Sequence, residues 1–355
     1  MSSQQHNDDF SFFELTEQYP DEDSAIEYFT NQRWPRGVTC PRCKSSEIYD
    51  SNASRHMPLW KCGKCGYQFT VTSGTVMADT KIPLRKWLFA FHMLGGAKQS
   101  LSTRYIARQL GITLKSAWHL THRIRKTMED NSQQFTGIVE GDETYIGGRR
   151  KHVGKGYRGN KIAVQTIVQR NSQRKDGSTI IGKSQTIALN PEADRVDGRT
   201  LGANLRKHTI PAKTRLMTDE NPAYLKVGQF FKSHERVHHK QEDYAHVEPY
   251  SGRVVTTNSA EGLTANLKRQ IQGTHHSTSK KHLPRYLEEY DYKYNTRDMS
   301  DTARTEAAIR QMEGRRVTLY KRSNGEGDAL IGHKSTEPGI QGTRRGLHLK
   351  RRKRS

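Results

Sequence analysis

Two adjacent acids, Asp142 and Glu143, lie in the stretch VEGDETYIGG of a chain that is otherwise strongly basic. The residues around them predict a β-strand, whose successive side chains point to opposite faces of a sheet. Asp142 would then share a face with Glu140, while Glu143 would lie on the far face. Such acids either neutralise a basic neighbour or hold a metal ion, and other carboxylates must converge on them for the second role.

Two further acids have settings that suit a metal site. Asp219 closes the run TRLMTDE, which predicts a short buried strand, and Glu261 lies near the start of the predicted helix NSAEGLTANLKRQIQG. Hard ions such as Mg²⁺ take oxygen ligands and leave positions for water and phosphate, so such acids can build a two-metal site for phosphodiester chemistry. Lys268, seven residues after Glu261, shares its helix face and could contact DNA near the ions.

The four cysteines form two CxxC pairs within 26 positions: Cys40 with Cys43, and Cys62 with Cys65. Two such pairs supply the four thiolates of a tetrahedral zinc site that has no open ligand position. The pattern predicts a structural zinc ribbon in a reducing compartment, and it does not indicate a disulfide framework.

The stretch STRYIARQLGITLKSAWHLTHRIRKTM predicts two helices that meet at Gly111, with Ser102 or Thr103 as the N-cap of the first. Its apolar stripes have the period and the break of a helix-turn-helix. An ordinary helical hairpin with solvated charges is the alternative. If the segment binds DNA, the candidates for facing phosphates or bases are Lys115, Ser116, His119, Arg123 and Arg125.

The remaining chain predicts an α/β sheet domain. Three consecutive β-branched runs from Gly137 onward predict three strands, followed by a helix over 197–208, the strand that ends at Asp219, a weaker strand and two helices. The predicted organisation is an N-terminal helical segment (1–36), the zinc ribbon (37–72), the helix-turn-helix-like region (80–130), the catalytic domain (136–300) and a basic, disordered tail (320–355).

The charge balance predicts a polyanionic partner. The 355 residues contain 59 Lys and Arg against 37 Asp and Glu, which gives a net charge of +22 and a pI of about 9.9. Nucleic acid is the usual partner of so basic a chain. No apolar run is long enough for a membrane span and no secretory signal is visible, so we expect a cytoplasmic, nucleoid-associated protein without a membrane partner.

Six motifs in consistent order between about residues 10 and 300 carry a family resemblance: RWPRGVTCPRC, CGKCGYQF, VEGDETYIGG, MTDENPAY, NSAEGLTANLKRQIQGTHH and HLPRYLEEYDYKYN. Together they resemble the ISXO-like insertion-sequence transposases of the DDE superfamily, which have an N-terminal zinc ribbon. The resemblance implies an RNase H-like catalytic domain with a mixed sheet. It also implies Asp142, Asp219 and Glu261 as the magnesium-binding triad, with Lys268 as the associated basic residue. The group varies at its third acidic position, so Asn258 is an alternative ligand or positioning residue.

The expected function is that of a DNA transposase. It would bind double-stranded DNA at the element ends and at the target, act as a homo-oligomer, and cleave and join strands with Mg²⁺ or Mn²⁺ beside a structural Zn²⁺. Two alternatives stay open: a non-catalytic DNA-binding regulator derived from a transposase, and an RNase H-like nuclease that cuts without joining.

Overall fold

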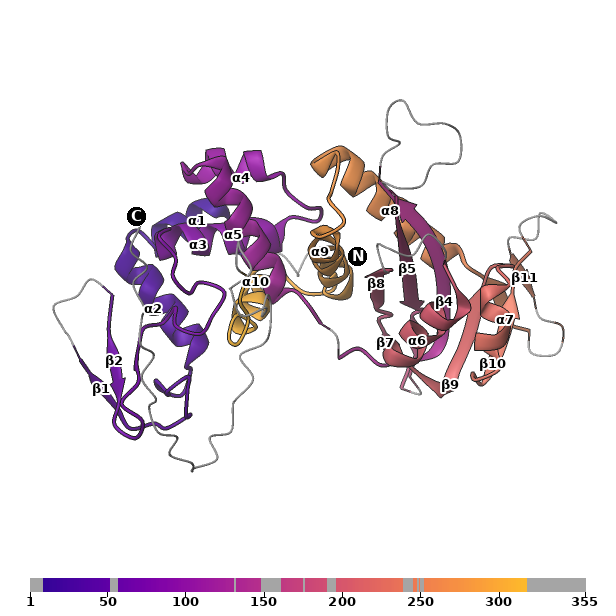
Figure 1. Cartoon of the computed structure of the whole chain (residues 1–355), viewed down its shortest axis with the longest axis horizontal. Coiled ribbons are helices and arrows are strands. Elements are labelled where there is room, and N and C mark those ends of the chain that lie inside the picture. The colour runs from indigo at the N-terminus through magenta and orange to yellow at the C-terminus, as the bar shows by residue number, and fades with distance from the viewer. Residues whose placement is uncertain are drawn as a thin grey trace, which may run out of the picture.

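The computed structural model describes residues 9–51, 57–130, 132–147, 161–174, 176–189, 196–238, 245–247, 249 and 252–317. These residues form two halves, a helical half that includes the cysteines and a half built on a sheet (Figure 1). The basic tail expected over 320–355 lies outside the described residues. None of the helices in the described part of the chain has the length and apolar composition that crossing a bilayer requires.

The helical half contains five helices that precede residue 128 and a small three-stranded sheet. The helices are α1 (Phe12–Gln18), α2 (Glu22–Arg33), α3 (Leu84–Gly96), α4 (Thr103–Leu110) and α5 (Leu114–Thr127). The strands β1 (Ile48–Asp50), β2 (Trp60–Cys62) and β3 (Gln68–Phe69) pair antiparallel in that order. One continuous apolar core joins the helices to this sheet.

The two helices predicted around Gly111 are present, and their ends follow from local chemistry. The Ser102 hydroxyl accepts a hydrogen bond from the Tyr105 N–H at the start of α4. Gly111 ends α4 in the left-handed conformation, with φ of 58°, which glycine adopts without the steric cost of a Cβ. Thr113 then caps α5 through the Ser116 N–H. The apolar stripes of both helices are buried in the core of the helical half.

A final helix, α10 (Asp301–Arg310), returns from the end of the sheet half to the helical half. The sequence pattern assigned no element to this stretch. Ala308, Ile309 and Met312 join the helical core, and the buried Arg304 guanidinium donates to the carbonyl of Gly95 at the end of α3. The N-terminal core is therefore completed by residues about 200 positions later in the chain.

The larger sheet has five strands in the order β10-β9-β4-β5-β8. They are β4 (Phe135–Ile146), β5 (Ile162–Gln169), β8 (Ser184–Ala188), β9 (Thr209–Thr218) and β10 (Ser233–Arg236). β4, β5 and β8 pair antiparallel, whereas β9 runs parallel to both β4 and β10. Short β6 (Ser172–Gln173) and β7 (Thr179–Ile180) form a hairpin beside it, and β11 (Ala245–Val247) pairs with β12 (Val254–Thr256).

The third predicted strand, STIIGKSQTIAL, is wrong as a single element. It divides into β7, which belongs to the hairpin, and β8, which belongs to the large sheet. Gly182 lies between them, so close to the backbone of Gln169 and Arg170 that a Cβ would overlap their atoms. The chain can change direction there because the residue has no side chain.

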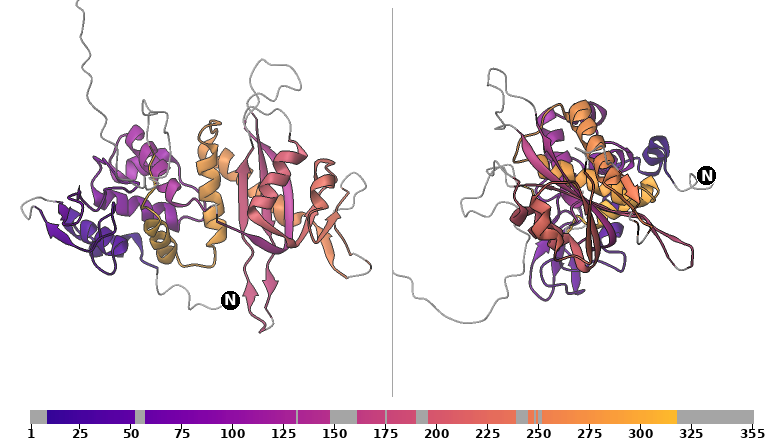
Figure 2. Two further views of the ribbon diagram at one scale, coloured as in Figure 1. Left: turned by 60° about the horizontal axis from the view of Figure 1, so that its bottom comes forward. Right: turned by 90° about the vertical axis from the view of Figure 1, so that its right-hand side faces the viewer.

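Helices cover both faces of the large sheet (Figure 2). On one face, α6 (Gly198–His208) and α7 (Ala223–Gly228) bury side chains such as Leu201 and Tyr224 against β4, β5 and β9. On the other, α8 (Asn258–Gln270) and α9 (Leu283–Asn295) pack against β4, β5 and β8. α9 also contacts α5, so it lies between the two halves.

Candidate active site

The register of the large sheet brings the first two candidate acids together. β4 and β9 are parallel, and Gly141 is paired with Thr218. Asp142 is the next residue on β4 and Asp219 follows the last residue of β9, so both carboxylates lie at the same edge of the sheet. Parallel strands place their carboxyl ends side by side, which is where ligand sites form in such sheets.

Asp142 points toward α8 and lies on the same face of β4 as Glu140, as predicted. The Thr264 hydroxyl on α8 donates to Asp142 Oδ2 at 3.2 Å. Burial, and then the negative charges of Asp219 and Glu261, raise the pKa of Asp142 to about 6. The Asp142 carboxylate therefore lies within the electrostatic field of both other candidate acids.

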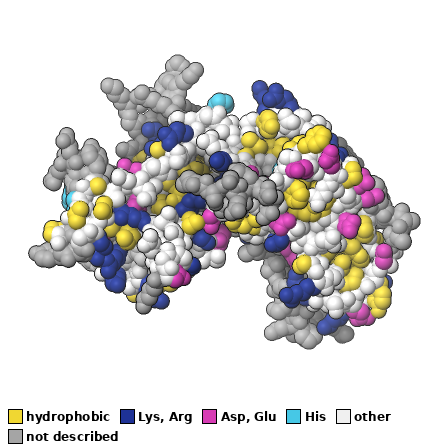
Figure 3. Space-filling model, turned by 180° about the vertical axis from the view of Figure 1, so that it is seen from behind, with side chains coloured by type: hydrophobic (Ala, Val, Ile, Leu, Met, Phe, Trp, Pro, Cys, Tyr) yellow, Lys and Arg dark blue, Asp and Glu magenta, His cyan; other side chains and the backbone are white. Residues whose placement is uncertain are grey.

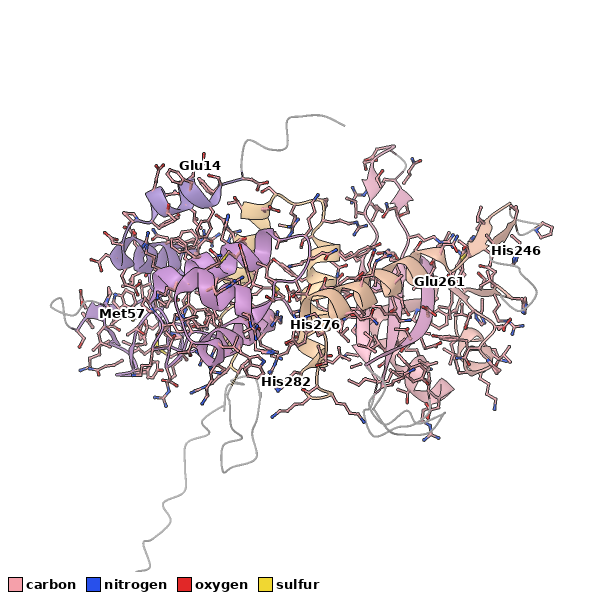
Figure 4. All side chains as sticks on the ribbon, turned by 90° about the horizontal axis from the view of Figure 1, so that it is seen from above. Glu14, Met57, His246, Glu261, His276 and His282 are labelled. Carbon is pink, nitrogen blue, oxygen red and sulfur yellow. The ribbon has the colours of Figure 1, made fainter. Side chains whose placement is uncertain are left out.

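Glu261 lies in the first turn of α8, where its Oε1 accepts a hydrogen bond of 2.7 Å from the Thr257 hydroxyl. Asn258, the alternative third residue, is exposed at the first position of the same helix. Lys268 is exposed two turns after Glu261 on the side of α8 that also bears Thr264. Helical spacing thus places these residues along one side of α8, the helix that packs on β4 and on which Figure 4 labels Glu261.

Glu143 lies on the opposite face of β4, as predicted, but the charges of Asp219 and Asp142 still act on its carboxyl group. It is largely buried beside Tyr224, and Asn221 Nδ2 donates to its Oε2 at 3.3 Å. Burial, together with the charges of Asp219 and Asp142, raises the pKa of Glu143 to about 7. Asn221 also donates its backbone N–H to Asp219 Oδ1 at 3.0 Å, so it links the two acids. No role was predicted for Asn221; its place two residues after Asp219, before a proline, is the signal of an Asx turn.

Glu140 shares the Asp142 face but is fully engaged in structural contacts. Arg170 forms an ion pair with it, and the backbone N–H of Ala260 donates to its second oxygen at 2.9 Å. Arg170 also donates to the carbonyl oxygens of Val254 and Thr256. Glu140 therefore anchors the start of α8 to β4, which sets the position of Glu261.

The four cysteines converge as predicted. Among the described residues they are the one group of His, Cys, Asp or Glu whose ligand atoms all lie within 4.8 Å of one another. The Sγ atoms of Cys40 and Cys65 are 3.7 Å apart, and those of Cys43 and Cys62 are 3.5 Å apart. A disulfide needs about 2.05 Å, whereas tetrahedral zinc–sulfur bonds of about 2.3 Å place the sulfurs about 3.8 Å apart. The site geometry fits a metal ion and not a disulfide.

Comparison with known proteins identifies both parts. Residues 134–295 match the ISXO2-like transposase domain, and residues 20–68 match the transposase zinc-ribbon domain. The chain carries both domains of an ISXO2-like transposase. An uncharacterized protein in the transposable element ISH50 of Halobacterium salinarum is 25% identical over 114 residues, which is 32% of this chain and 38% of that relative. The chain therefore matches well under half of that relative's length.

The two matched regions contain the candidate metal ligands. The ISXO2-like match includes Asp142, Asp219 and Glu261. The zinc-ribbon match begins just before α2 and ends just after Cys65, so it includes all four cysteines. Helices α3, α4 and α5 lie between the two matches. The ISXO2-like domain ends at Asn295, the last residue of α9.

Two of the DNA-facing candidates on α5 are wrong. Arg125 is completely buried and forms an ion pair of 2.7 Å with Glu289 of the ISXO2-like domain. Arg123 is also buried, and its Nη2 donates to the carbonyl of Ala78 at 2.7 Å. Lys115 at the start of α5 is exposed, and Ser116 and His119 are partly exposed. Periodicity could not predict this burial, because the chain before α3 covers Arg123 and α9 covers Arg125 on a different side of α5.

Proposed function

We propose that this protein is a DNA transposase that binds the ends of an insertion sequence and then cleaves and joins DNA strands. One observation carries the proposal. Asp142 and Asp219 lie at the ends of two parallel strands, and with Glu261 of α8 they form a group in which Asp219 and Glu261 both disfavour the ionisation of Asp142. A cation offsets that repulsion, and oxygen ligands of this kind suit Mg²⁺ or Mn²⁺.

The topology supports an RNase H-like catalytic domain. Three antiparallel strands are followed by two parallel ones, with helices on both faces and the candidate acids on the first strand, the fourth strand and a later helix. This is the arrangement that the family resemblance implied. We propose the 136–300 region as this domain, with α10 as an added helix that ties it to the helical half.

The chain's own residues would hold and orient the reacting groups. Thr264, the Asn221 N–H and Thr257 each bond one acid, so Asp142, Asp219 and Glu261 are held in position before DNA arrives. Two bound metal ions would activate a water or a 3′-hydroxyl and stabilise the leaving oxygen. Glu261 is the better third ligand than Asn258, because it affects the Asp142 carboxyl directly and brings a charge.

The helical half would recognise the element ends. The zinc ribbon and the pair α4 and α5, as a helix-turn-helix-like unit, supply exposed basic side chains that include Lys115 and Arg108. On the face shown in Figure 3, Lys and Arg side chains occur over both halves of the molecule. DNA bound along such a surface would reach from the helical half to the acids.

The test uses the DNA that flanks the open reading frame. Duplexes that carry its terminal inverted repeats are incubated with the full chain and Mg²⁺ or Mn²⁺, and strand cleavage and the joining of a pre-cut end are measured. A transposase performs both steps. Cleavage without joining would identify a nuclease, and tight binding without any metal-dependent cleavage would identify a regulator; either result overturns the proposal.

DNA affinity is expected to fall steeply with salt. Each phosphate contact made by Lys or Arg releases counterions, so six to ten contacts cost about 10³–10⁵ in affinity between 50 and 200 mM salt. Fluorescence anisotropy on an element-end duplex across this range measures the effect. An affinity that stays flat would contradict DNA binding through the basic surface.

Removal of zinc is expected to unfold the ribbon and to destabilise the helical core. Cys40 and Cys62 are fully buried and belong to the same core as α2 and α3, and zinc-binding energy in such modules is folding energy. Chelation at neutral pH should therefore lower the melting temperature and release about one zinc per chain, measured with a chromogenic zinc indicator. An unchanged melting curve after complete removal of zinc would contradict this prediction.

A further inference from the structure

The chain just after α8 has an unusual backbone. α8 continues into a π-helical turn, Ile271–His275, and His276 then adopts a left-handed φ of 58° with ψ of −43°. This conformation is costly for a residue with a Cβ, and π-helical turns and backbone strain both concentrate at functional sites. Figure 4 shows Glu261 and His276 at opposite ends of the α8 segment.

A pocket of about 130 Å³ lies between this segment and the end of β4. One water needs only about 10–15 Å³, so the pocket admits a larger polar group. The residues with polar side chains that line it are Tyr145, Lys268, Gln272, His276, Ser277 and Thr278.

The pocket offers hydrogen-bond donors and positive charge. Lys268 is exposed at its edge, and the Thr278 hydroxyl is buried without a hydrogen-bond partner among the described residues. The chain has no acidic residue from Gly262 to Leu287, and this stretch includes the basic residues Arg269, Lys280 and Lys281. A buried hydroxyl with no partner costs free energy, which an incoming oxygen acceptor would offset. An anion with oxygen acceptors, such as a phosphate, fits this combination.

The distance to the candidate acids agrees with a DNA phosphate. Tyr145 lies three residues beyond Asp142 on β4, which is about 10 Å at about 3.3 Å per residue. Duplex DNA rises about 3.4 Å per nucleotide along its axis, and successive phosphates of one strand are farther apart than this rise, so a span of about 10 Å corresponds to at most about three nucleotides. The segment also leads toward the helical half, because His275 Nε2 is 2.9 Å from Ser100 Oγ.

We propose that this pocket binds one non-bridging phosphate oxygen of the reacting DNA strand, within three nucleotides of the bond that is cut. The inference rests on the proposed transposase function. Lys268, which the family resemblance already implies near DNA, lies at the rim, and the new element is the Thr278 hydroxyl, which would donate a hydrogen bond inside. The contact would fix the strand between the helical half and the acids.

The experiment replaces single DNA phosphates with uncharged methylphosphonates at the first four positions on each side of the cut. Metal-dependent cleavage of these element-end duplexes is compared for the full-length wild type, Thr278→Val and Lys268→Met. Lys281→Met is the matched control, because it removes an exposed charge from the same basic segment without lining the pocket. Melting curves confirm that all variants are folded.

At one position, the methylphosphonate should slow cleavage by the wild type and by Lys281→Met about tenfold, as expected for the loss of a single phosphate contact. Thr278→Val and Lys268→Met already lack part of this contact, so the same substitution should slow their cleavage less than about twofold relative to their own rate on unmodified DNA. If every variant responds to every position as the wild type does, the pocket does not bind that phosphate and the inference is overturned. Failure of the wild type to cut unmodified DNA would instead overturn the proposed function.

Discussion

Asp142→Asn should abolish metal-dependent cleavage of element ends and leave DNA binding without divalent metal intact. Asn keeps an oxygen that can accept the Thr264 hydrogen bond, so the local fold is preserved while the charge that would hold the ion is lost. Metal ions contribute several kcal/mol to phosphodiester chemistry, and each 1.36 kcal/mol corresponds to a tenfold change in rate. We therefore expect a loss of about a thousandfold or more in single-turnover cleavage.

Two controls define this result. Asp176→Asn removes an exposed acid on the β6–β7 hairpin, far from the candidate site in the fold, and should cleave at the wild-type rate. Glu143→Gln removes the neighbouring charge on the opposite face of β4 and should keep cleavage within about tenfold, since one lost tuning interaction is worth about 1 kcal/mol. If Glu143→Gln were as inactive as Asp142→Asn, the assignment of the metal ligand to one face of β4 would be wrong.

Glu289→Ala should be the most destabilising single change at the contact between the two halves. Glu289 of α9 and Arg125 of α5 are both fully buried and form an ion pair of 2.7 Å, which Lys293 and the Ser100 hydroxyl extend. Removal of one partner leaves a buried charge uncompensated, which costs about 3–5 kcal/mol. Urea denaturation of the full chain measures the loss in free energy of unfolding.

The matched control is Glu306→Ala, which breaks the Arg310–Glu306 pair on the surface of α10. A solvent-exposed pair of this kind contributes about 0–1 kcal/mol. Replacing both Arg125 and Glu289 with Met should recover part of the stability lost in Glu289→Ala, because the buried Arg125 charge is then removed together with its partner, while Lys293 keeps its hydrogen bond to the Gln99 carbonyl. A Glu289→Ala variant within 1 kcal/mol of the wild type would show that the two halves are held together by other contacts.

The same pair predicts a pH dependence of stability. Burial alone would raise the pKa of Glu289, but the charges of Lys293 and Arg125 outweigh it and hold the pKa well below the usual carboxyl value. Because the pKa is lower in the folded state than in the unfolded state, the pair contributes its full stabilisation at pH values above the ordinary carboxyl pKa of about 4.3. Its contribution is lost as the pH falls below that value, so the wild type and Glu289→Ala should converge in stability in acid.

The sequence alone could predict much of the candidate site, because its chemistry is local. Two CxxC pairs specify a tetrahedral thiolate site wherever the hairpin between them folds, and the cysteine cluster is confirmed. Asp142, Asp219 and Glu261 could be selected by residue type and by their places at a strand, a strand end and a helix start. Alternation along β4 correctly placed Glu140 and Asp142 on one face and Glu143 on the other, because side-chain direction in a strand has a period of two.

The tertiary structure decided what depends on distant partners. Periodicity shows that Arg123 and Arg125 are on α5, but only the packing of α9 shows that Arg125 faces Glu289 and is unable to reach DNA. The same is true of Glu140, which lies beside Asp142 yet is occupied by Arg170 and the start of α8. α10 was missed because its role is to fill a core that begins near the N-terminus. Burial and ion pairing depend on which elements meet in space, and a single sequence carries that information only through the complete fold.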